Sequence, residues 1–186
     1  MKKFFTVLIA CMLLLSAVYG SAEQLFDTAP AYTLSEEELS SIGLPGAFVP
    51  FEELGLRLCL PDGFSETDAG PAANDTDVQM MRVFVSDSYH FSVKVSVVFL
   101  SGVETFEAMV DKWTSEMNEA HAAPAIVNGC ECLLCDSANA DGTSQQSLFI
   151  IGGSGSWLML EISPIADENE NAFAELIELS LQPIAF

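Results

Sequence analysis

The sequence predicts an α+β fold, in which an antiparallel β-sheet packs against α-helices. Segments with the two-residue period of a strand follow one another along the chain, whereas in a parallel α/β fold they would alternate with helices. Residues 89–100 show this period most clearly, with apolar side chains at odd positions 91–99 and polar ones at even positions 90–96. Two other stretches carry apolar residues at intervals of three and four, which is the period of an α-helix.

The first 22 residues predict a secretory signal peptide. Two lysines precede an almost unbroken apolar run at residues 4–19, and small residues at 20–22 provide a cleavage site. The run is shorter than the roughly 20 residues of a spanning helix, so we expect no membrane insertion after cleavage. The sequence therefore predicts a secreted, extracytoplasmic bacterial protein. The alternative is a lipoprotein anchored at Cys11, because "LIAC" fits a bacterial lipoprotein box.

The charge of the chain is strongly acidic. There are 27 acidic and 6 basic residues, which give a formal net charge of −21. Such a surface repels nucleic acid and anionic membranes, so neither is expected as a partner. It favours solubility, cationic partners or weak binding of divalent ions.

Residues 23–49 predict an N-terminal extension with one short helix, ahead of a single domain at 50–186. Ser35 and Glu38 have the spacing of a capping box, so a helix should begin there and end near Gly43. Residues 43–50 resemble a turn-rich connector.

The domain should open with a strand at 54–60 that ends at a Pro-Asp-Gly turn. An acidic loop follows, and then two strands at 78–85 and 89–100.

The second half of the domain predicts a helix, three strands and a closing helix. Apolar residues from Phe106 to Met117 recur at helical spacing, and Pro124 closes that region. Residues 125–136, 144–153 and 156–163 are then expected as three strands joined by turns. Asp167 is placed to cap the final helix.

This order of elements resembles the PsbP-like family. "GLRLCLPDGF" at 55–64 resembles its opening strand. The long hairpin, the amphipathic helix, the "VNG" at 127–129 and the closing "FAELIELSLQPI" at 173–184 follow in that family's order. The resemblance covers residues 50–186 and implies an α/β/α sandwich. The family includes plant photosystem accessory proteins, exported bacterial lipoproteins and a Ran-binding transport factor. The resemblance therefore implies a protein that acts by binding, and it supplies no catalytic residues.

Three cysteines in "GCECLLC" have a spacing that suggests a metal or redox site. However, Leu133 and Leu134 favour a strand, which would place Cys130 and Cys132 on one face and Cys135 on the other. Three thiolates on opposite faces cannot converge on one metal ion.

Two alternatives remain open for these thiols. Cys59 could form a disulfide with Cys130, Cys132 or Cys135 in an exported chain, or the four thiols could be buried and free.

A small cationic patch is the most promising binding feature in the sequence. Lys94 shares a strand face with His90, and Arg82 lies on the neighbouring strand. If Arg82 shares that face and Glu161 joins it, the patch could hold an anionic ligand or a partner's carboxylate. The alternative is a set of cross-strand salt bridges.

Calcium binding and catalysis receive less support. Asp68, Asp75 and Asp77 in the acidic loop are candidate calcium ligands, but they lack the residue order of an EF-hand loop. "GGSGSW" at 152–157 does not match a nucleophile elbow, and we interpret it as a hairpin turn. No cofactor is expected.

We therefore predict a non-enzymatic, monomeric, exported binding or accessory module that engages a protein partner. The alternative is a small-ligand or divalent-cation binding protein that uses the polar sheet face or the acidic loop.

Overall fold

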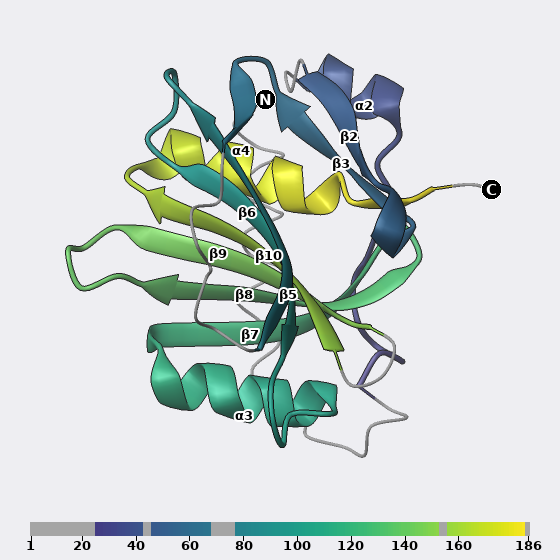
Figure 1. Ribbon diagram of the computed structural model, residues 1–186, viewed down its shortest axis with the longest axis vertical. Helices are drawn as coiled ribbons and strands as arrows, with labels where there is room; N and C mark the ends of the chain where they lie inside the picture. Colours follow the sequence, from purple (N-terminus) through teal and green to yellow (C-terminus); the bar gives the residue numbers. More distant parts are fainter. Residues whose placement is uncertain (1–24, 43–45, 68–76, 153–155, 185–186) are drawn as a thin grey trace.

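The computed structural model describes residues 25–42, 46–67, 77–152 and 156–184. They form an eight-stranded sheet with the order β1-β7-β8-β9-β10-β6-β5-β4 and a three-stranded sheet with the order β11-β3-β2 (Figure 1). Only the β1–β7 pair is parallel among these strand pairs. The antiparallel sheets and packed helices confirm the α+β class.

The bounds of the elements are as follows. The large sheet contains β1 (Ala31–Tyr32), β4 (Phe64–Thr67), β5 (Val78–Ser86), β6 (Ser92–Phe99), β7 (Asn118–Val127), β8 (Cys130–Ala138), β9 (Ser144–Ile151) and β10 (Ser156–Ile165). The small sheet contains β2 (Gly46–Phe51), β3 (Leu56–Pro61) and β11 (Gln182–Pro183). The helices are α2 (Glu36–Ser41), α3 (Phe106–Glu116) and α4 (Glu168–Leu179), with a 3-10 turn at Glu52–Leu54.

The helix starts follow the predicted capping residues. Ser35 and Glu38 form a complete capping box at α2, which satisfies backbone donors at its first turn. The Asp167 carboxylate accepts hydrogen bonds from the amides of Asn169 and Glu170 at the start of α4. None of the described helices is long and apolar enough to cross a membrane.

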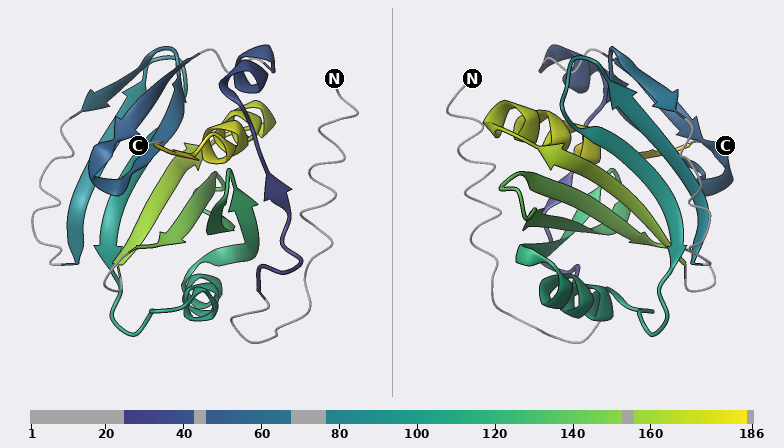
Figure 2. Two further views of the ribbon diagram at one scale, coloured as in Figure 1. Left: turned by 90° about the vertical axis from the view of Figure 1, so that its right-hand side faces the viewer. Right: turned by 60° about the vertical axis from the view of Figure 1, so that its left-hand side comes forward.

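The large sheet buries apolar side chains on both faces. We call the face toward α4 and the small sheet the inner face, and the face toward α3 the outer face. Leu160 and Ile162 of β10 belong to the inner core, whereas Trp157 of the same strand belongs to the outer core with Trp113 of α3. Figure 2 shows α4 and α3 on opposite sides of the strands β7–β10. Successive side chains of a strand point to opposite faces of the sheet, and this alternation assigns them to the inner or the outer core.

The expected single strand at 125–136 is wrong, because the structure makes a hairpin there. β7 and β8 pair as antiparallel neighbours around a turn at Asn128 and Gly129. Both turn residues have positive φ, 48° and 85°. Asn-Gly is the dipeptide that tolerates two successive positive φ values best, and it matches the twist of a two-residue hairpin.

The residues before the opening strand also form more structure than expected. β2 occupies most of the predicted connector and pairs with β3 along its whole length. Gly46 is required there, because a Cβ atom at this position would collide with the carbonyl oxygen of Leu60. β4 likewise forms inside the predicted acidic loop. Leu39 of α2 is almost completely buried in the inner core.

One side chain joins three distant segments. The Asn128 Oδ1 atom accepts a hydrogen bond from the Leu34 amide at 2.9 Å. Its Nδ2 atom donates to the carbonyl oxygens of Leu179 and Leu181, at 3.1 and 2.7 Å. The β7–β8 turn therefore holds the N-terminal segment and satisfies carbonyl groups at the end of α4, which would otherwise lack partners.

Replacing Asn128 tests this junction. Asn128→Gly keeps the left-handed backbone accessible but removes three hydrogen bonds, so we expect a loss of about 2–3 kcal/mol in the free energy of unfolding. Asn128→Asp retains the acceptor for the Leu34 amide but sets a carboxylate oxygen against the two carbonyl oxygens, so it should lose at least as much. Urea denaturation of both variants measures the difference, and equal stability of Asn128→Gly and wild type would contradict the role.

The burial of Leu39 predicts that α2 contributes to the stability of the domain. Leu39→Ala should lower the free energy of unfolding by about 2–4 kcal/mol, because it leaves a cavity in the inner core. Ile42, which follows the same helix and is exposed, is the matched control. Ile42→Ala should change the stability by less than about 0.5 kcal/mol. Equal effects of the two substitutions in urea denaturation would show that α2 is not docked.

Candidate functional site

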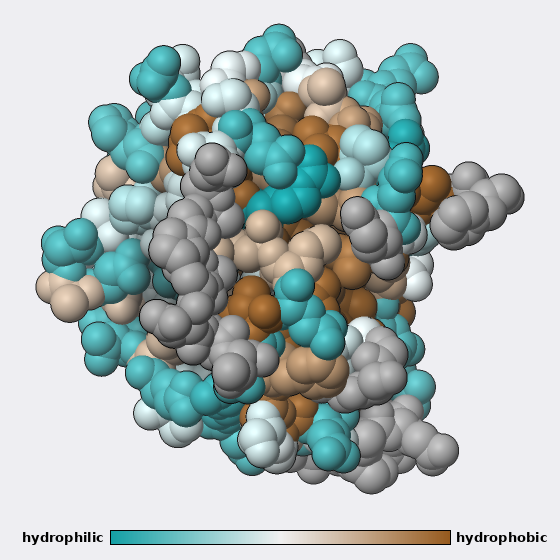
Figure 3. Space-filling view, in the orientation of Figure 1, coloured by the Kyte–Doolittle hydropathy of each residue, from teal (hydrophilic) through white to brown (hydrophobic). Residues whose placement is uncertain are grey.

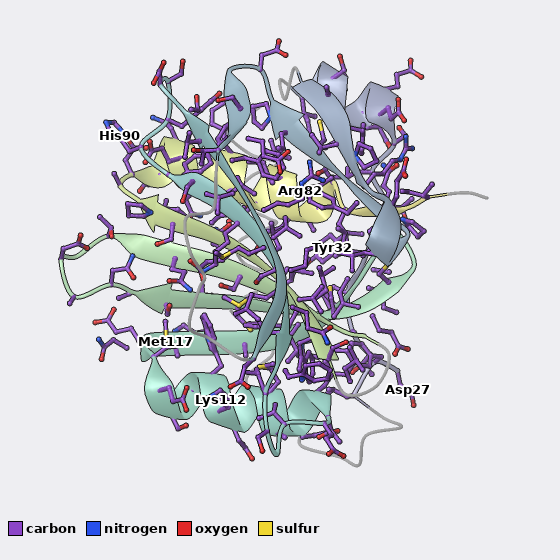
Figure 4. The ribbon with its side chains drawn as sticks, in the orientation of Figure 1. Asp27, Tyr32, Arg82, His90, Lys112 and Met117 are labelled. Atoms are coloured by element: carbon purple, nitrogen blue, oxygen red, sulfur yellow. The ribbon has the colours of Figure 1, made fainter. Side chains whose placement is uncertain are left out.

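The four residues predicted as a cationic patch do not come together. In the register of β5 and β6, Val83 lies opposite Lys94, and Arg82 lies opposite Val95. Arg82 is therefore on the inner face, whereas Lys94 is on the outer face. Figure 4 shows Arg82 near the centre of the view and His90 at a far corner of the molecule. The prediction of one shared patch is wrong, because the hairpin register puts Arg82 and Lys94 on opposite faces.

Arg82 instead connects strands from both sheets. Its guanidinium makes two hydrogen bonds with the Glu66 carboxylate, at 2.8 and 2.7 Å, and a third with the Pro50 carbonyl oxygen at 3.0 Å. It also lies over the rings of Phe51 and Phe84, at 4.7 and 5.2 Å from their centroids. The hydrogen bonds from Arg82 lower the pKa of Glu66. Arg82 thus ties β5 to β4 and β2.

Lys94 and His90 each have their own carboxylate. The Lys94 Nζ atom lies 2.7 Å from Glu161, which is directly opposite it on β10. The His90 Nδ1 atom lies 2.8 Å from Glu170 of α4. Lys94 and Glu161 therefore form a cross-strand salt bridge, which was the alternative to a ligand site.

Every lysine and arginine side chain in the described ranges is paired with a carboxylate. Besides the pairs of Arg82 and Lys94, Arg57 lies 2.8 Å from Glu36, and Lys112 lies 2.6 Å from Glu116. Since the acidic residues outnumber these partners, the surplus negative charge stays uncompensated. The described surface is consequently suited to cationic rather than anionic ligands.

The four described cysteines are free thiols, so the disulfide alternative is not realised in this structure. Cys132 belongs to the inner core and Cys135 to the outer core, as the strand period predicted. Burial raises the pKa of Cys132 and Cys135 well above the ordinary range, which keeps both thiols neutral and unreactive.

The calcium candidates lie mostly outside the described residues. This holds for Asp68 and Asp75, whereas Asp77 immediately precedes β5. Within the described ranges, no group of three or more His, Cys, Asp or Glu side chains is arranged to hold a metal ion.

A groove on the small sheet is a surface feature that the sequence did not reveal. It has a volume of about 360 Å³, and its lining consists of Phe48, Pro50, Glu52, Arg57 and Ile184. These residues come from β2, the 3-10 turn, β3 and the segment after β11. The groove therefore exists only because β2 and β11 flank β3.

Arg57 is held rigidly at this groove. Its guanidinium lies 4.5 Å from the centroid of the Phe48 ring. One nitrogen pairs with Glu36, and another donates to Gln182 at 2.7 Å. Three contacts from three elements fix a side chain that would otherwise lose much conformational freedom on binding.

A local signal for the groove was present in the sequence. Phe48 and Pro50 alternate with Val49 and Phe51, which is the pattern of a two-sided strand, and Arg57 interrupts the apolar run of β3. Pro50 is compatible with an edge strand, because its missing N–H group removes no ladder hydrogen bond when it points away from the sheet.

Comparisons with known proteins identify the fold. No protein-family model matches the sequence, and a search of curated proteins finds no match. The structure is similar to the solution structure of cyanobacterial PsbP (CyanoP) from Synechocystis sp. PCC 6803. That alignment has a TM-score of 0.51 and 12% identity, and it covers 76% of this chain and 95% of that chain. The Ran-binding protein Mog1p of Saccharomyces cerevisiae aligns with a TM-score of 0.46 and 13% identity, over 76% of this chain and 97% of that chain. The chain is an α+β domain, and its fold is PsbP-like, as the sequence resemblance predicted.

Thiol labelling checks the state of the cysteines. Alkylation of the denatured protein without reductant should label all four described cysteines, and peptide mass spectrometry reads the label at each one. In the native protein, half-buried Cys130 should react before the buried Cys132 and Cys135, because access controls thiol reaction. A disulfide-linked peptide containing Cys59 would contradict the structure.

Proposed function

We propose that the protein is an exported, non-enzymatic binding module and that the groove on the small sheet engages a protein partner. The rigidly held pair of Arg57 and Phe48 is the observation that carries this proposal. Arginine and aromatic residues are enriched among the side chains that dominate protein–protein affinity, particularly where they are fixed before binding. Pro50 and Ile184 add apolar surface beside them.

The charge of the groove selects the chemistry of the partner. Glu36 neutralises Arg57, and Glu52 adds an exposed carboxylate to the lining. In Figure 3, hydrophilic side chains dominate the margin of the molecule, and hydrophobic ones gather toward the centre of the view. A segment that carries an apolar side chain next to a lysine or arginine would match both the groove and the acidic field around it.

Site-specific photocrosslinking tests the proposal. Benzoylphenylalanine at position 48 in the producing cell should yield a discrete protein adduct. The matched control carries the same probe at Ile151, which is exposed at the end of β9 in the large sheet, and it should yield no such adduct. Arg57→Ala should weaken the affinity for the captured partner about tenfold or more, because it removes a central anchor.

Salt provides the second part of this test. Adduct formation should fall as ionic strength rises, because exposed charges are screened at distances beyond about 8–10 Å at physiological salt. Identical adducts at positions 48 and 151, or none at position 48, would overturn the proposal. An adduct that is insensitive to salt would overturn the cationic chemistry of the partner but not the groove.

A further inference from the structure

An acidic cluster lies where α4 packs on the inner face of the large sheet. Glu175 and Glu178 project from α4, and Asp136 and Gln146 are paired neighbours on β8 and β9. Asn171 connects them: it accepts a hydrogen bond from the Gln146 amide at 2.9 Å and donates one to Glu175 at 3.0 Å. Asp136 is exposed, whereas both glutamates are buried, so the cluster extends from solvent into the interior.

Glu178 is the deepest member, and its carboxyl group lacks compensation. Its side chain is 5% exposed, and its Oε1 atom has no hydrogen-bond partner among the described residues. The Oε1 atom of Gln146, 7% exposed, is also unpartnered there. A proton on the Glu178 carboxyl group would turn this unpartnered buried acceptor into a donor and remove its charge.

The groups that face Glu178 do not neutralise it. Glu175 lies on the same helix, and β8 contributes Asp136 and the thiol of Cys132, whereas Cys135 lies on the outer face. On β7, exposed His121 lies opposite Asp136. The four described lysine and arginine side chains all pair with other carboxylates. Desolvation, followed by the charges of Glu175 and Asp136, raises the pKa of Glu178 well above its ordinary value.

The residues that follow Glu178 lead directly to the groove. The Ser180 hydroxyl accepts a hydrogen bond from the Cys59 amide of β3 at 2.9 Å. Gln182 holds Arg57 and donates to the Leu34 carbonyl oxygen at 2.8 Å. The Ile184 amide donates to Gly55 at 2.8 Å, and its side chain lines the groove. We call residues 180–184 the β11 arm.

We propose that Glu178, together with Glu175 and Asp136, forms a proton-binding site that controls the docking of the β11 arm and thereby the groove. The control of partner binding rests on the proposed function, whereas the control of the arm does not. With the proton bound, Glu178 is neutral and the last turn of α4 stays packed. When the proton leaves, a negative charge enters a buried position that none of the described lysine or arginine side chains neutralises, and moving the last turn toward water relieves it.

The direction of the pH dependence follows from the raised pKa of Glu178. The stabilisation of the docked arm is fully present below the ordinary glutamate pKa of about 4.3, and it is lost as pH rises through the raised folded-state value. Glu170 at the other end of α4 behaves oppositely. Burial alone would raise the pKa of Glu170, but hydrogen bonds from the amides of His90 and Ala166 lower it overall. The contribution of ionised Glu170 to the stability of the folded protein is therefore present at neutral pH and is lost on acidification.

Hydrogen exchange on the isolated protein tests the arm without a partner. At pH 8, peptides covering residues 180–184 and 55–60 should exchange at least threefold faster in wild type than in Glu178→Gln. At pH 5 the two proteins should exchange equally, after correction for intrinsic rates. Glu168→Gln changes an exposed glutamate on the same helix and should behave as wild type. α3 should exchange equally in all variants.

The outcomes are distinguishable. Equal exchange of wild type and Glu178→Gln at pH 8 would overturn the inference, and so would faster exchange of the variant at both pH values. If Glu178→Gln does not fold, Glu178→Met replaces it, because methionine has no ionisable group. Residues 180–184 of Glu178→Met should exchange slowly at both pH values. Failure of crosslinking at position 48 would remove the proposed function and leave the exchange result standing. If both hold, adduct yield at position 48 should be lower at pH 8 than at pH 5 in wild type alone.

Discussion

The hydrogen bonds of Asn128 join three parts of the chain on whose association the fold depends. A two-residue turn between β7 and β8 needs positive φ at both positions, which asparagine followed by glycine provides. The same turn places the Asn128 amide within reach of Leu34 and of the end of α4. The N-terminal segment, the β7–β8 hairpin and the C-terminal helix thus meet at one residue. Because these segments are far apart in sequence, their association is a tertiary constraint that no local pattern encodes.

The second constraint is that both faces of the large sheet are covered. β8 illustrates the result, because Cys132 packs inward under α4 and the small sheet, and Cys135 packs outward toward α3. Most charged groups are therefore confined to edges, turns and the outer surfaces of helices. The few basic groups pair with acidic ones there, and this pairing contributes little to stability at exposed positions. Because the described lysine and arginine side chains are all used in these pairs, the remaining charge of the described surface is negative. The Arg57 groove differs from the rest of this surface in its shape and not in its charge.

The sequence predicted what local chemistry determines. The caps at Ser35 and Asp167, the stripe of α3 and the split of Cys132 from Cys135 depend only on neighbours in the chain, and the structure contains them. The order of strands and helices was also enough to identify the fold class.

The features that the sequence did not predict depend on contacts between distant residues. The face of Arg82 depends on the register of the β5–β6 hairpin, and a shift of one residue reverses it. β2 becomes a strand through its pairing with β3, and the groove needs β11 from the far end of the chain. β7 was missed because residues 118–124 lack a clear apolar alternation, although the Asn-Gly dipeptide was a usable turn signal.

The two ends of α4 connect this architecture to its chemistry. Its first turn is held by an ionised carboxylate, because Glu170 accepts hydrogen bonds from the backbone of His90 and Ala166. Its last turn is held best when Glu178 is neutral, because that carboxyl group is buried without a cation. An apolar side chain at position 178 would continue the core beside Ile177 and Leu181 with no dependence on protons. A carboxyl group there makes the order of the last turn depend on pH, and the arm that follows carries Gln182 and Ile184 to the groove. The helix therefore has one end that is stabilised by ionisation and one that is stabilised by protonation, and only the second is joined directly to the surface that we propose for binding.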